Sequence, residues 1–102
     1  MSKISFFYDS NSVYKVSLKA LVKRDFIIEE MDQNTGIIKA STKKKLLKPS
    51  IKIELEIKPV SETQTSLDIK SISDKSWITP HEYEAKAEQK FINTLYKCFD
   101  AM

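Results

Sequence analysis

Cysteine and glycine each occur once in this chain of 102 residues, and proline occurs only three times. Because Cys98 is the only cysteine, no disulfide can form within the chain, and a lone thiol is typical of a reducing compartment. A single glycine excludes a glycine-rich phosphate-binding loop. One histidine without clustered carboxylates gives no metal-ligand pattern, so we expect no metal, no cofactor and no enzymatic activity.

Long apolar stretches are also missing. The apolar run near the N-terminus is too short for a signal peptide, and no run approaches the roughly 18 apolar residues that cross a membrane. Hydrophobic residues make up 41% of the chain and charged residues 30%, as in soluble globular proteins. We therefore expect one cytoplasmic domain over residues 1–102 with no membrane span. Its net charge of +3 permits an anionic partner without requiring one.

The clearest pattern is the alternation of apolar and charged residues over Ile51–Lys58. Successive side chains of a strand point to opposite faces, so this segment predicts a strand with one packed face and one wet face. Such strands are typical of antiparallel sheets. Four further segments are expected to be strands: Ile4–Tyr8, Phe26–Met31, Ile37–Thr42 and Thr65–Ile72.

Charge predicts the register between the last two strands. The favoured register pairs Ile57 with Ile69. It places Lys58 opposite Asp68, and opposite charges across a strand pair are stabilising. A slip of two residues would instead place Glu56 opposite Asp68, and like charges there cost a few tenths of a kcal/mol. We therefore expect the first register.

Gly36 is expected to close the hairpin between the second and third strands, where the loop needs a positive φ. In the second strand, one phase of the alternation turns Glu30 inward and the other turns Glu29 inward. A β-bulge would resolve this conflict. A buried catalytic glutamate is the other interpretation, and the sequence leaves both open.

Two segments have the periodicity of amphipathic helices. The first covers roughly Ser12–Arg24 and follows several candidate N-caps in Asp9–Ser12. The longer second one runs from Pro80 to near Phe99 and opens with the capping box Thr79-Pro80-His81-Glu82. The apolar side of the first helix is expected to hold Tyr14, Leu18, Leu21 and Val22. The apolar side of the second is expected to hold Tyr83, Ala87, Phe91, Leu95 and Cys98.

The expected element order is β-α-β-β-β-β-α, an α+β fold with an antiparallel sheet of about five strands and both helices packed on one face. This order resembles that of the TATA-binding-protein half-domain and of the helix-grip proteins, the START and Bet v 1-like group. The hairpin with Asp32 and Thr35-Gly36-Ile37-Ile38-Lys39-Ala40 is also similar to a turn in small bacterial domains of unknown function. The resemblance covers nearly the whole chain as topology.

The resemblance implies two uses of the sheet. Helix-grip proteins bind apolar ligands between the sheet and the long helix, which implies a small apolar ligand beneath the C-terminal helix. TATA-binding-protein relatives contact DNA with the open sheet face. Here that face is expected to carry acids that repel phosphate, so we do not expect nucleic acid on it. Its charged residues would be Lys52, Glu54, Glu56, Lys58, Asp68 and Lys70.

Few residues suggest a contact site. The loop Lys43–Lys48 is either a solvated connection or a site for an anionic partner, nucleic acid or an anionic membrane surface. Its lysines are Lys43, Lys44, Lys45 and Lys48. Phe7 and Trp77 are the aromatic residues expected at a contact surface or pocket. His81 and Cys98 lie 17 positions apart on one predicted helix, about 25 Å, so they cannot form a nucleophilic pair.

These observations predict a small, non-enzymatic bacterial binding domain. Its partner is expected to be a protein at a sheet edge or a small apolar ligand beneath the C-terminal helix. The edge hypothesis rests on a short first strand that is open on one side, which would also permit a homodimer. The alternative is an anionic partner at the Lys43–Lys48 loop.

Overall fold

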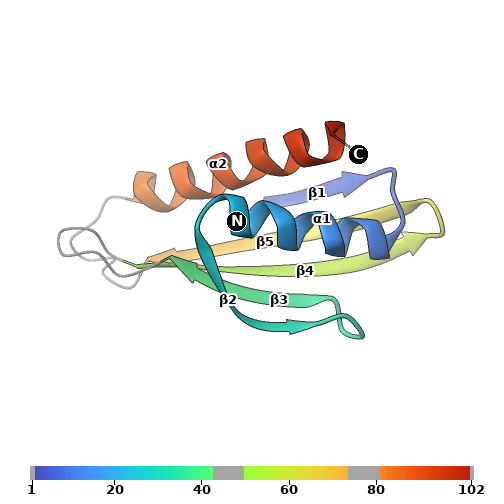
Figure 1. The fold of residues 1–102 in the computed structure, drawn as a ribbon, viewed down its shortest axis with the longest axis horizontal. Helices are drawn as coiled ribbons and strands as arrows, with labels where there is room; N and C mark the ends of the chain where they lie inside the picture. Colours follow the sequence, from blue (N-terminus) through green and yellow to red (C-terminus); the bar gives the residue numbers. More distant parts are fainter. Residues whose placement is uncertain (1, 43–49, 74–80, 102) are drawn as a thin grey trace.

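The computed structural model describes residues 2–42, 50–73 and 81–101. The elements are β1 Ser2–Phe6, α1 Ser10–Lys23, β2 Phe26–Asp32, β3 Ile37–Thr42, β4 Ile51–Ser61, β5 Gln64–Ser73 and α2 His81–Asp100. The strands form one antiparallel sheet in the order β1-β5-β4-β3-β2, and both helices lie on one side of it (Figure 1). The predicted α+β class and element order are confirmed.

The core lies between the sheet and the two helices. Alternate side chains of β4 point into it, and their charged neighbours point to the open face, as the alternation predicted. Each buried aliphatic side chain of this kind contributes roughly 1.5–3 kcal/mol relative to exposure. The β4 core residues are Ile51, Ile53, Leu55 and Ile57. Above them, α2 contributes Phe91, Ile92, Leu95, Cys98 and Phe99.

Helix α1 begins two residues earlier than predicted because Asp9 is its N-cap. The Asp9 carboxylate accepts hydrogen bonds from the hydroxyl of Ser12, at 2.5 Å, and from the Ser12 N–H, at 3.4 Å. The hydroxyl contact is the main cause that lowers the pKa of Asp9. Val22 was expected on the apolar side and is exposed instead. It follows the buried Leu21, and one residue turns about 100° around a helix, so Val22 leaves the buried stripe.

A β-bulge resolves the conflict in β2. The register with β3 shifts between Ile28 and Glu30, and both Glu29 and Glu30 are exposed. The bulge interpretation is therefore confirmed, and the interpretation of a buried glutamate is wrong. Because the bulge turns its side chain outward, Glu30 lies 3.6 Å from the ammonium of Lys39 on the neighbouring strand.

The hairpin between β2 and β3 uses Gly36 as predicted. Gly36 has a φ of +74°, and its N–H donates to the carbonyl oxygen of Asp32 at 2.8 Å. Its own carbonyl oxygen accepts from the N–H of Ile57 in β4, also at 2.8 Å. A Cβ at this position would collide with the carbonyl oxygen of Ile57. Glycine is therefore required both by the turn and by the close approach of the two backbones.

The predicted register between β4 and β5 is wrong. The strands pair Ile57 with Leu67, two residues away from the expected partner Ile69. Glu56 consequently faces Asp68, the like-charge pair that the charge argument disfavoured.

Turn geometry and one lysine explain this register. Ser61 pairs with Gln64 across a two-residue connection, and a register shift between Pro59 and Ser61 then brings Ile57 opposite Leu67. The ammonium of Lys58 lies 3.4 Å from the Glu56 carboxylate and 3.7 Å from that of Asp68. Lys58, which lies diagonally across from Asp68, therefore compensates the like-charge pair. A count of directly opposite residues does not include such a diagonal contact.

Candidate functional site

Strand β1 forms one edge of the sheet. It pairs with β5 from Ser2, opposite Ile69, to Phe6, opposite Thr65. No described strand pairs with its other side. The strand ends where the chain turns toward α1, and there the carbonyl oxygen of Tyr8 accepts from the Thr65 hydroxyl at 2.8 Å.

The register identifies which backbone groups of β1 are open. The N–H of Ile57 donates to Gly36, so every second residue of β4, counted from Ile57, points its backbone groups toward β3. The even-numbered residues of β4 point their backbone groups toward β5 and bond to its even-numbered residues. The odd-numbered residues of β5 therefore point the other way and bond to β1. Their partners in β1 are Ser2, Ile4 and Phe6. The N–H and C=O groups of Lys3 and Ser5 therefore point to the open edge.

Aromatic side chains surround the end of this edge. The ring of Phe99 in α2 stacks on Phe6, with centroids 4.7 Å apart, and on Tyr8, with centroids 4.6 Å apart. The ring centroid of Tyr96 lies 5.8 Å from that of Phe6, and Tyr96 is 47% exposed. Phe7, predicted as a contact aromatic, follows β1 directly and is 83% exposed. The edge is thus bordered by aromatic surface that water reaches.

The opposite edge, β2, is built differently. By the same alternation, its open backbone groups belong to Phe26, Ile28 and Met31. The bulge makes their spacing irregular, and it places Glu29 and Glu30 beside them as exposed acids. A bulge of this kind interrupts the regular ladder that an added strand would need. Of the two edges, β1 alone offers regularly spaced open groups.

The open face of the sheet carries a neutralised charge pattern. One row of directly opposed residues crosses four strands with alternating sign. The row consists of Glu30, Lys39, Glu54 and Lys70. Opposite charges therefore adjoin one another along the whole row, which stabilises the pairing and keeps this face wet.

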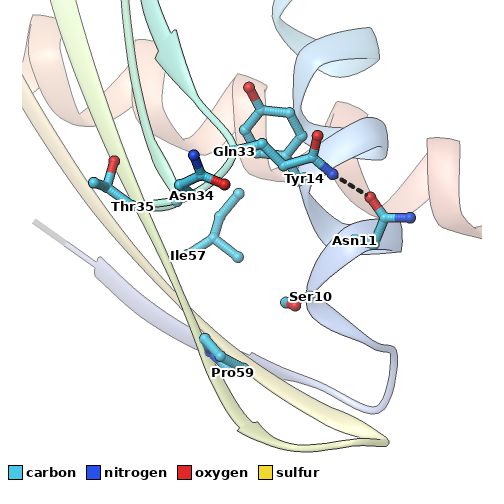
Figure 2. A pocket seen from close by; sticks show the side chains of 9 residues that line it. Ser10, Asn11, Tyr14, Gln33, Asn34, Thr35, Ile57 and Pro59 are labelled. Carbon is cyan, nitrogen blue, oxygen red and sulfur yellow. Dashed lines mark hydrogen bonds between the residues drawn. The ribbon is translucent and has the colours of Figure 1, made fainter.

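A cavity of about 210 Å³ lies between the start of α1, the β2–β3 hairpin loop and β4 (Figure 2). The Gln33 side-chain amide donates to the Asn11 side-chain oxygen at 2.6 Å and joins the loop to the helix. Asn34 and other uncharged polar groups line the cavity, and Ile57 and Pro59 form its apolar wall. It suits a small neutral polar group. Since it does not lie beneath α2, the predicted apolar ligand there stays a prediction.

Several predicted residues lie outside the described part of the chain. They are Lys43, Lys44, Lys45, Lys48 and Trp77, together with the capping residues Thr79 and Pro80. Cys98 is a buried free thiol on the same helix as His81, as predicted. Within the described residues, no three His, Cys, Asp or Glu side chains gather as a metal site, and no helix is long and apolar enough to span a membrane.

One buried charged residue was not singled out from the sequence. Glu88 of α2 is 4% exposed, and its carboxylate accepts from the Ser71 hydroxyl of β5 at 2.7 Å. The signal was present, because Glu88 lies three residues before Phe91 and seven before Leu95, on the apolar stripe. The contact ties α2 to the sheet.

Comparison with known proteins adds the fold and no function. No family model matches the chain, and no curated protein matches it. The solved structure of an uncharacterised protein from Bacillus thuringiensis is similar, with a TM-score of 0.70 over 98% of this chain and 95% of that chain. The two sequences are 7% identical, so the likeness concerns the fold alone.

Proposed function

We propose that this protein is a non-enzymatic binding domain that contacts a protein partner through the open edge of β1. The observation that carries the proposal is the pair of residues Lys3 and Ser5, whose backbone groups point away from the sheet at regular spacing. An extended segment laid against β1 would receive main-chain hydrogen bonds from both.

The surroundings of β1 support the same use. Phe7 exposes most of its ring beside the end of the strand, and Tyr96 exposes about half of its side chain next to Phe6. Exposed aromatic rings contribute large apolar areas to contact surfaces. Main-chain bonds would thus hold a partner strand, and the aromatic side chains would select among such strands.

Position-specific photo-crosslinking in the cells that express the protein tests this proposal. Phe7 is replaced by benzoylphenylalanine. A matched probe replaces Ile27 of β2, the edge strand interrupted by the bulge, where the Ile27 side chain is 47% exposed. We expect cross-linked protein adducts from position 7 and few from position 27.

Ser5→Pro provides the second arm of the test. The N–H of Ser5 points to the open edge, so proline there removes an edge donor without removing a bond to β5. The adducts from position 7 should disappear with Ser5→Pro and persist with Ser5→Ala. Equal adducts from both probes, or adducts that Ser5→Pro leaves unchanged, would contradict the proposal.

A further inference from the structure

We infer that the strand received by β1 is the β1 strand of a second copy of this chain. This inference rests on the proposed function of the β1 edge and names its partner. A symmetric pair of this kind would join two five-stranded sheets edge to edge, with the same surface used by both copies. The two-fold axis would stand perpendicular to the sheet, so the helices of both copies would lie on the same side.

The sequence of β1 is complementary to itself in the antiparallel direction. With the axis at Ile4, Lys3 lies opposite Ser5 of the second copy, and Ser5 lies opposite its Lys3. These residues carry the open backbone groups, so both pairs can exchange their N–H···O=C bonds. The self-pairing therefore uses every open group that the strand offers between its ends.

Side chains fit this register as well. Ile4, half-buried on the helix side of the sheet, would meet Ile4 of the second copy. Phe6 would face Ser2 of the second copy in the same register. Pairing would thus cover the part of Ile4 that the single chain leaves exposed.

Charge disfavours the neighbouring register on the N-terminal side. An axis at Lys3 would place Lys3 directly opposite Lys3 of the second copy, and like charges in that position are destabilising. An axis at Ile4 sets each lysine opposite an uncharged serine instead. Since the paired strand has five residues, the interface is small, and we expect a reversible dimer that depends on concentration.

Sedimentation velocity across a concentration series tests the inference. We expect the weight-average mass of the full chain to rise from 11.8 kDa toward twice that value between about 1 and 500 μM, a range set by the small interface. Ser5→Ala should behave like the wild type. Ser5→Pro should stay at 11.8 kDa throughout, with circular dichroism as the check that it is folded.

Cysteine cross-linking fixes the register independently of the proline variant. In a Cys98→Ala background, Ile4→Cys should form an intermolecular disulfide, because residues facing each other in a non-hydrogen-bonded pair have Cα atoms about 4.5 Å apart. Lys3→Cys is the matched variant one position away. The two cysteines introduced at position 3 would not face each other, so this variant should cross-link much more slowly.

The outcomes separate this inference from the proposed function. A chain that stays monomeric but still gives position-7 adducts with another protein overturns the second copy as partner and leaves the edge function standing. A monomer without such adducts overturns both. A dimer that persists in folded Ser5→Pro, or equal cross-linking of Ile4→Cys and Lys3→Cys, also overturns the inference.

Discussion

Asp25 and Gly36 are the two described residues whose φ is positive, and only one of them is a glycine. Gly36 has no side chain to clash with Ile57. Asp25, with a φ of +62°, follows the C-cap of α1 and adopts a conformation that costs most residues with a side chain about 1 kcal/mol. The same backbone conformation is therefore relaxed at one turn and strained at the other.

Substitutions at these two positions should change stability in opposite directions. Gly36→Ala should lower the free energy of unfolding by about 2 kcal/mol or more, because strain and the collision with Ile57 add. Asp25→Gly should raise it by about 0.5–1 kcal/mol. Urea denaturation measures both. An unchanged free energy of unfolding in Gly36→Ala would contradict the described hairpin.

The Asp9 cap makes the stability of the folded chain depend on pH, and the lowered pKa gives the sign of that dependence. Its pKa in the folded chain is lowered below 3.8, so its contribution to stability is present above that pH and is lost as the pH falls through the folded-state pKa. Asp9→Asn keeps a capping side chain but does not ionise. The stability difference between wild type and Asp9→Asn should therefore shrink below about pH 4. A difference that stays constant in thermal unfolding down to pH 2 would refute this.

Among the elements, β4 and β5 show that the sequence predicts a strand and its buried face but not the register between two strands. The alternation over Ile51–Lys58 predicted a strand and its buried face, because this pattern is local. The register depended on a two-residue turn followed by a register shift, and on the diagonal contact of Lys58 with Asp68. None of these enters a comparison of directly opposite charges. Contacts between distant segments, such as Gln33 with Asn11 beside the cavity, were equally out of reach.

Lys58 should offset the repulsion between Glu56 and Asp68 in this register. Lys58→Met should lower the free energy of unfolding by about 0.5 kcal/mol, a small value because the lysine is largely exposed. Adding Glu56→Gln removes the like-charge pair and should recover most of that loss. Denaturant titration of the two single variants and the double variant measures the coupling. Additive effects would show that Lys58 does not compensate the pair.

Over the whole molecule, the two edges of the sheet differ in the regularity of their pairing. Both helices lie against one face (Figure 1), and a row of residues with alternating charge crosses the other. The edge β2 is interrupted by its bulge, whereas β1 is short and regular. The sequence suggested a short open first strand, but the identity of its open groups needed the register of all five strands.

Residue-resolved amide hydrogen exchange at low and high protein concentration tests the edge pairing most directly. We predict that the amides of Lys3 and Ser5 become protected as concentration rises, because a second copy of β1 accepts their hydrogen bonds. Among the open groups of β2, the amides of Ile28 and Met31 should exchange at the same rate in both samples. Lys3 and Ser5 amides that exchange equally fast at both concentrations, or protection that arises in β2 instead, would contradict the pairing of β1 with a second copy.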